Sequence, residues 1–89
     1  MTDKLQRGTQ IVYIPNHADG DIYHPDVEHG FITSGPTLDG AYFCRYWSKG
    51  HLGEDIRTKS CSELTPGKNI RVMEIANQEK VQEMLERYC

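Results

Sequence analysis

The residues best suited to chemistry lie in one stretch, between Val12 and Ser34. It contains three histidines and four acidic residues, with no lysine or arginine. Zinc is bound in proteins by histidine nitrogen, cysteine sulfur and carboxylate oxygen in tetrahedral sets. Because a long loop can fold such ligands together, one hypothesis is a metal site that combines His17, His24 and His29 with Asp19, Asp21 or Asp26. Of these sets, His17, Asp21, His24 and His29 is our first choice.

The same residues also have a structural interpretation, which we favour from the sequence. Six residues separate His17 from His24 and four separate His24 from His29, and these spacings match no strong zinc signature. The imidazoles can instead hydrogen-bond the loop backbone, and the aspartates can cap turns. On this interpretation no cofactor is predicted, and the residues expected to shape the loop are Pro15, Gly20, Pro25, Asp26 and Gly30.

The cysteines Cys44, Cys61 and Cys89 are odd in number and widely spaced, with no CxxC pair. This pattern favours reduced thiols over a disulfide framework. Cys44 lies in a strand-like run, where a thiol most often fills space in the core. No local motif places a nucleophile beside a base and an orienting group, so we predict that the chain is not an enzyme.

Aromatic residues near the long loop suggest a binding surface instead. Small barrels often recognise peptides or nucleic acids with aromatic side chains beside such a loop. The predicted surface consists of Tyr23, Phe43, Arg45 and Trp47, and Tyr23 is expected to be the most exposed of them. A second, basic patch lies in the later half of the chain and consists of Lys49, Arg57, Lys59, Lys68 and Arg71.

These residues must be positioned by short strands. A β-branched run ends at Pro15, and a long polar loop over 16–29 follows it. Asp39 and Gly40 form the turn signal of a hairpin. A tight helical turn is expected over 60–66, with Leu64 as its buried anchor. The predicted strands cover 9–14, 30–34, 41–47, a short stretch near 55–59, and 68–73.

Alternation in the run over 41–47 predicts which side chains point inward. Tyr42, Cys44 and Tyr46 share one face of such a strand. The other face includes an arginine, so we expect the face with the two tyrosines to point into the core. The outer or partly covered face then carries Phe43, Arg45 and Trp47.

The C-terminal segment has the pattern of an amphipathic helix. Asn77 is a favourable N-cap, and Glu79 lies in the first turn. A helix this short is marginal alone in water, so it should pack on the barrel or at the interface of a homodimer. Its apolar stripe at positions i, i+3, i+4 and i+7 consists of Val81, Met84, Leu85 and Tyr88.

Length and composition indicate one domain. The 89 residues allow a flexible leader over 1–7, a small barrel over 8–73 and the helix over 77–89. The strands follow one another with no helix between them, which favours an antiparallel sheet over βαβ units. The net charge of −3 makes nucleic acid a less favoured partner. No apolar run approaches the roughly 20 residues that span a membrane, and the polar start lacks a signal-peptide pattern, so a cytoplasmic location is expected.

The segments VYIPNHADGD, HPDVEHGFITS, AYFCRYW and ELTP together resemble a group of small phage and prophage proteins. The resemblance spans about residues 8–66. It implies a phage-type protein in a bacterial host cell, and the order of elements resembles a Src-homology-three-like (SH3-like) barrel. We therefore expect a mainly β fold, a five-stranded antiparallel SH3-like barrel with one C-terminal α-helix.

The function expected from the sequence is that of a non-catalytic binding module with a protein partner. A nucleic-acid-associated accessory protein that uses the basic patch is the first alternative. A metal-binding protein or metal-dependent enzyme that uses the His/Asp loop is the second. The apolar stripe of the helix also allows a homodimer.

Overall fold

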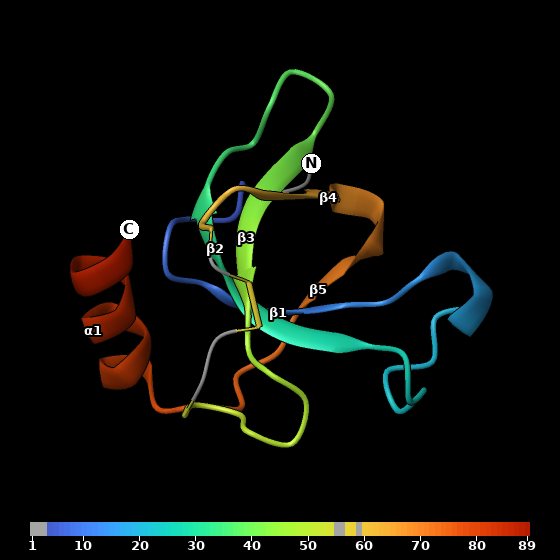
Figure 1. Cartoon of the computed structure of the whole chain (residues 1–89). Helices are drawn as coiled ribbons and strands as arrows, with labels where there is room; N and C mark the ends of the chain where they lie inside the picture. The colour runs from blue at the N-terminus through green and yellow to red at the C-terminus, as the bar shows by residue number, and fades with distance from the viewer. Residues whose placement is uncertain (1–3, 55–56, 59) are drawn as a thin grey trace.

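The computed structural model describes residues 4–54, 57–58 and 60–89. Within these residues the fold is mainly β, with one five-stranded antiparallel sheet and one C-terminal helix (Figure 1), which confirms the predicted fold class. The strand order is β4-β3-β2-β1-β5. The strands are β1 (Gln10–Tyr13), β2 (Glu28–Ser34), β3 (Ala41–Tyr46), β4 (Glu63–Pro66) and β5 (Ile70–Val72), and the helices are α1 (Gln78–Tyr88) and the short 3₁₀ turns η1 (Asn16–Ala18) and η2 (Gly67–Asn69).

The sheet curls around an apolar interior. The predicted alternation in β3 is confirmed, because Tyr42, Cys44 and Tyr46 are all buried there beside Ile11 and Ile32. The hydroxyl of Tyr46 forms a 2.5 Å hydrogen bond with Thr65 of β4, so the buried polar atom has a partner. Burial raises the pKa of the Cys44 thiol, consistent with the predicted role of Cys44 as core filler.

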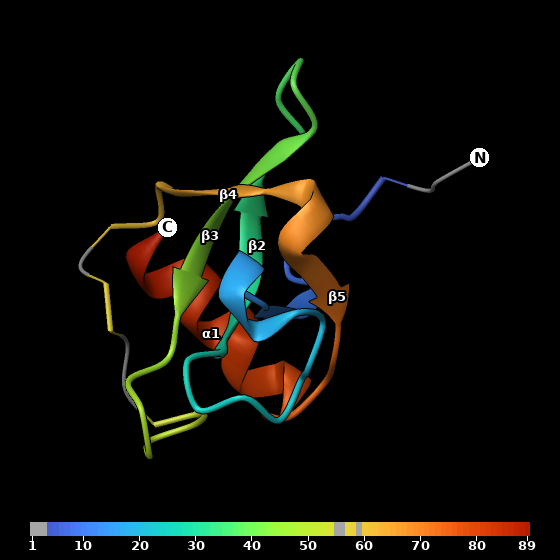
Figure 2. The same cartoon turned by 90° about the vertical axis from the view of Figure 1, so that its right-hand side faces the viewer.

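Helix α1 covers the other face of the sheet. Asn77 caps it as predicted, since its side chain accepts a hydrogen bond from the Glu79 amide at 2.8 Å. The buried residues of its stripe pack against Phe31 and Trp47 of the same chain. Figure 2 shows α1 behind the sheet and the loop after β1 in front of it, so the helix and this loop lie on opposite sides. No helix in the described part of the chain is both long and apolar enough to cross a lipid bilayer.

The prediction for residues 60–66 is wrong. Glu63–Pro66 form strand β4, which pairs with β3, and the 3₁₀ turn η2 follows it. Leu64 lies opposite Phe43 in this ladder and is 57% exposed, whereas Thr65 is buried. The alternation of the strand turns Leu64 outward, so it cannot anchor a core. The strand expected near 55–59 falls mainly on residues outside the described ones, and Arg57 and Thr58 are not in a strand.

The prediction of reduced cysteines is also wrong for two of the three. Cys61 and Cys89 form a disulfide, with Cα atoms 6.0 Å apart, while Cys44 is free and buried. The bond joins the segment just before β4 to the end of α1 across 28 positions of sequence. Cross-linking a loop of this length contributes roughly 3 to 4 kcal/mol in the chain-entropy model.

The leader is attached to the sheet from Leu5 onward and is not free along its whole length. The Leu5 amide donates to the Tyr42 hydroxyl at 3.0 Å, and Arg7 Nη1 donates to the Thr33 carbonyl at 3.0 Å. Gly8 then donates its amide to the Ile32 carbonyl at 2.8 Å. These bonds lead the chain into β1.

Candidate metal centre

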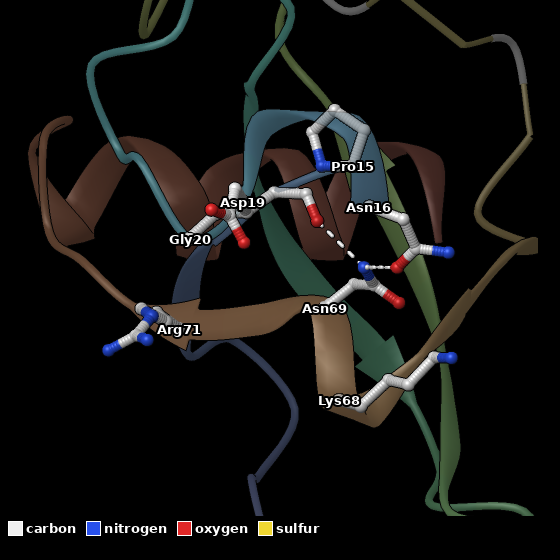
Figure 3. Close-up of a pocket in the computed structure, with 8 residues that line it drawn as sticks. Pro15, Asn16, Asp19, Gly20, Lys68, Asn69 and Arg71 are labelled. Carbon is white, nitrogen blue, oxygen red and sulfur yellow. Dashed lines mark hydrogen bonds between the residues drawn. The ribbon is translucent and has the colours of Figure 1, made fainter.

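The loop between β1 and β2 is a series of tight turns. Pro15 ends β1 and precedes η1, and the turn after it uses left-handed backbone at Asp19 (φ 52°) and Gly20 (φ 79°). The Asn69 side-chain amide donates to the Ile14 carbonyl at 2.7 Å and to Asn16 Oδ1 at 2.8 Å (Figure 3). The loop is therefore fastened to η2 from its first residues.

An apolar underside also fixes the loop. Ala18 is buried against Val12 and Ile14, and Ile22 and Val27 pack on the same cluster. The polar side chains of the loop consequently point away from this cluster and toward solvent. The sequence interpretation of the loop as a packed excursion agrees with this arrangement.

Three of the polar side chains converge on the outer surface of the loop. His17 Nε2 lies 2.7 Å from Asp26 Oδ2, and His24 Nδ1 lies 3.9 Å from the same oxygen. The two imidazole rings meet edge to face, with centroids 5.2 Å apart. One potential ligand atom from each residue lies within 4.8 Å of the others, so the three residues form a compact cluster, the His17–His24–Asp26 cluster.

The charges and hydrogen bonds around Asp26 favour its ionised carboxylate, which is the form that binds a metal. The hydrogen bond from His17 lowers the pKa of Asp26, and the neighbouring His24 and Lys49 lower it further, so the carboxylate is ionised at neutral pH. The Asp26 amide donates to His24 Nδ1 at 3.0 Å, so this nitrogen acts as an acceptor. A metal bound at Nδ1 would take the place of this amide as the partner of the lone pair.

The geometry suits a tetrahedral ion. Zinc–nitrogen and zinc–oxygen distances near 2.0 to 2.1 Å place tetrahedral ligand atoms about 3.3 Å from one another. The two distances to Asp26 Oδ2, 2.7 Å and 3.9 Å, lie on either side of that value. Two imidazoles and one carboxylate leave a fourth position for water or another ligand. Binding one tetrahedral ion would require these distances to become more nearly equal.

Only two of the four predicted ligands belong to this cluster. Asp21 accepts a hydrogen bond from the Tyr23 amide at 2.9 Å and thus caps a turn. His29 lies in β2 opposite Val12 and is half-buried; its Nδ1 has no hydrogen-bond partner among the described residues. Burial lowers the pKa of His29. Asp26, which the sequence offered both as an alternative ligand to Asp21 and as a shaping residue of the loop, is the acidic member of the cluster.

The remaining shaping residues act on the backbone. A side chain at Gly30 would collide with the Arg45 carbonyl and the Tyr46 backbone of β3, so only glycine fits there. Gly20 supplies left-handed backbone in the first turn. The Pro25 carbonyl accepts a hydrogen bond from Lys49 Nζ at 3.1 Å, which links the loop to the turn after β3.

The predicted aromatic surface does not form. Trp47 and Arg45 are 3% and 6% exposed and lie beneath α1, and Phe43 is partly buried on β3. Tyr23 alone among the four is open to solvent, at 84% exposed, and it lies in the loop. The sequence did not reveal that α1 covers this face of β3. What surrounds Arg45 instead is the pair of disulfide-bonded cysteines and Tyr88.

The predicted basic patch is divided. Lys68 and Arg71 line a pocket of about 200 Å³ beside the loop, but Figure 3 shows their side chains pointing in different directions. Arg57 forms ion pairs with Glu28 at 2.9 Å and Glu63 at 3.6 Å, so its charge is compensated. Lys59 lies outside the described residues. The described part of the chain therefore lacks a continuous basic stripe.

Comparison with known proteins reveals no relative: no protein-family model, no curated protein and no solved structure matches this chain. The function is therefore inferred from the geometry of the chain itself.

Proposed function

We propose that the chain is a small, non-catalytic binding module whose first loop binds one divalent transition-metal ion, of which zinc is the best fit. The observation that supports it is the convergence of His17, His24 and Asp26, whose ligand atoms lie within 4.8 Å of one another. Imidazole nitrogen with carboxylate oxygen is a donor set that zinc accepts. The ion would then link His17 in η1 to His24 and Asp26, which lie later in the same loop.

In this proposal the ion orders the loop and thereby the residue that projects from it. Tyr23 precedes His24 and is largely exposed. A tyrosine held rigidly at a surface supplies contact area at a low cost in conformational entropy. We therefore propose that the metal-bound loop presents Tyr23 to a protein partner.

Metal titration of the untagged full-length chain tests this function. After treatment with a chelator, zinc is added and the heat of binding is measured. We expect one zinc ion per chain, and we expect His17→Gln and Asp26→Asn each to weaken binding by at least about tenfold.

His51→Gln is the matched control, because the His51 side chain is 60% exposed and that of His17 is 62% exposed. This variant should bind zinc like the original chain. Substoichiometric zinc, or equal weakening by His51→Gln, would contradict the proposal.

A second candidate is protein binding without a metal. It is favoured by the exposure of Tyr23 and also by Leu38, whose side chain projects fully from the hairpin between β2 and β3. Comparing capture of host proteins by the original chain, by Tyr23→Ala and by Leu38→Ala, in chelator and in zinc, separates the two candidates. Capture that depends on Tyr23 but not on zinc supports the second.

We also propose that the protein is of phage or prophage origin, that its sheet is related to SH3-like barrels, and that it is cytoplasmic. Nucleic-acid binding through Lys68 and Arg71 is tested by titrating DNA and RNA at low and high salt, since phosphate contacts weaken steeply as salt rises.

A further inference from the structure

Arg45 is a buried cation whose nearest acceptors are sulfur atoms. It is 6% exposed, and its Nη1 lies 3.0 Å from Cys61 Sγ and 3.8 Å from Cys89 Sγ. The guanidinium carbon lies 5.0 Å from the centre of the Tyr88 ring. These contacts place Arg45 directly against the disulfide, on the side of the sheet that α1 covers.

The charge of this arginine has no anionic partner among the described residues. None of the ion pairs there includes Arg45, and its Nε has no hydrogen-bond partner. A buried cation is costly unless it is paired, and sulfur in a disulfide is only a weak acceptor. In the oxidised protein the guanidinium therefore lies beside the disulfide with no anionic partner in the part of the chain that the structure describes.

We propose that Cys61 and Cys89 form a reactive thiol–disulfide pair that exchanges with low-molecular-weight thiols, with Arg45 stabilising the Cys61 thiolate that reduction releases. A cation beside a thiol favours the thiolate. Stabilising the reduced form in this way makes a disulfide easier to reduce. The pair is therefore a redox-active site and not only a cross-link.

The two sulfurs have different roles. Cys61 is the one nearer to Arg45. Cys89 is the C-cap of α1, and its amide donates to the Leu85 carbonyl. The carbonyl end of α1 faces both sulfurs, because the Tyr88 carbonyl oxygen lies 3.4 Å from Cys61 Sγ, so the contact with Arg45 is what distinguishes them. Cys61 is therefore the better leaving group, and Cys89, which is exposed, is the sulfur that an incoming thiol attacks.

The exchange proceeds in two steps. A small-molecule thiolate attacks Cys89 Sγ, a mixed disulfide forms, and the electron pair of the broken S–S bond leaves on Cys61, where Arg45 contacts it. A second small-molecule thiolate then attacks the small-molecule sulfur of the mixed disulfide. Cys89 leaves as a thiolate and takes a proton. Two thiols are oxidised to one small-molecule disulfide, the protein gains two electrons, and the second proton goes to solvent.

This site is separate from the metal loop. The disulfide lies at the end of α1, and the loop lies on the opposite side of the sheet (Figure 1). Cys44 does not compete in the exchange, because it is buried and burial raises the pKa of its thiol. The redox proposal therefore stands or falls independently of zinc binding.

Equilibration of the full-length protein in buffers of reduced and oxidised glutathione tests the proposal. The fraction of disulfide is trapped with a maleimide and measured by mass spectrometry. We expect Arg45→Met to shift the equilibrium constant toward the disulfide by at least about tenfold, and Arg45→Lys to restore much of the original value. Circular dichroism monitors the fold of each variant.

Arg87→Met is the matched control. Arg87 also contacts the Tyr88 ring, at 5.9 Å, but its ion pair is with Glu83. We expect this variant to leave the redox equilibrium within about twofold of the original chain. An equal shift in Arg45→Met and Arg87→Met, or no shift in either, overturns the proposal.

A measurement on the unmodified sequence covers the case in which Arg45→Met does not fold. In the reduced protein at neutral pH, iodoacetamide should alkylate Cys61 at least about tenfold faster than Cys89, because only the thiolate reacts. Equal rates, or faster labelling of Cys89, overturn the assignment of Arg45.

Discussion

The side-chain amide of Gln10 forms two hydrogen bonds with the backbone of Ala76. Its Oε1 accepts from the Ala76 amide at 2.9 Å, and its Nε2 donates to the Ala76 carbonyl at 2.7 Å. Gln10 is 2% exposed, and its Oε1 also accepts from Ile75. One buried amide thereby fastens the segment before α1 to β1, and so sets where the helix begins its path over the sheet.

Gln10→Leu should destabilise the chain by about 1 to 3 kcal/mol. The substitution keeps the size of the side chain but leaves the amides of Ile75 and Ala76 without their acceptor. Urea unfolding followed by circular dichroism measures the loss. Equal stability of Gln10→Leu and the original chain would contradict this role.

Gly30→Ala should cost about 3 kcal/mol or more. A Cβ at this position would meet the Arg45 carbonyl and the Tyr46 backbone, which cannot move without breaking the β2–β3 ladder. Gly40→Ala is the comparison, because Gly40 has φ 81° but open space around its missing Cβ. That variant should cost only about 1 kcal/mol. Thermal unfolding of both variants shows which one loses more stability. A similar loss in the two would mean that the backbone of β3 moves to make room for the added Cβ.

Leu85→Ala should lower the free energy of unfolding by about 2 to 5 kcal/mol, since Leu85 of α1 is buried against Phe31 and Trp47. Leu64→Ala removes the same atoms from an exposed position of β4 and should cost less than about 1 kcal/mol. Chemical denaturation of the two variants measures the difference. The reverse order would restore Leu64 as a core anchor and contradict the strand assignment.

Stability should fall as the pH drops below about 6.5 because of His29. Burial lowers its pKa from 6.5 in the folded chain, so between 6.5 and the lower folded value the unfolded chain binds a proton that the folded chain does not. The contribution of His29 to the free energy of unfolding is fully present above pH 6.5 and is lost as the pH falls through this window. Urea midpoints between about pH 8 and pH 5 show the slope.

His29→Gln should flatten this slope, whereas His51→Gln should leave it in place. The lowered pKa of Asp26 acts in a different range, below its ordinary value of 3.8, so the two effects are separable. An unchanged slope in His29→Gln would assign the acid sensitivity to other groups.

Local patterns predicted the elements that local forces determine. The apolar stripe of α1, its Asn77 cap and the alternation in β3 all follow from neighbouring residues, and each is present. The turn around Leu64 was misjudged because Pro66 and the preceding serines suggested a local turn. Pairing with β3, which lies far away in sequence, determines the conformation there instead.

The site was predicted in part for the same reason. Composition identified the loop and its candidate ligands, with Asp26 as one of three aspartates that could complete the set, but the turns decide that Asp26 faces His17 while Asp21 caps the backbone. No sequence signal joins Cys61 to Cys89, because only the packing of α1 on the sheet brings the end of the chain beside the start of β4. Likewise, the charge of Arg45 favours an outward-facing position on β3, but α1 packs over this face of the strand and buries the side chain.

The strand order leaves β4 and β5 as the two edges of the sheet, and both are short, with four and three residues. Pro66 ends β4 and has no amide hydrogen to offer, and Glu63 and Arg71 place charges along the two borders. Short, charged and proline-ended borders discourage edge-to-edge aggregation, in which a neighbouring molecule adds its own strand. We therefore expect this small chain to resist edge-to-edge aggregation at high concentration.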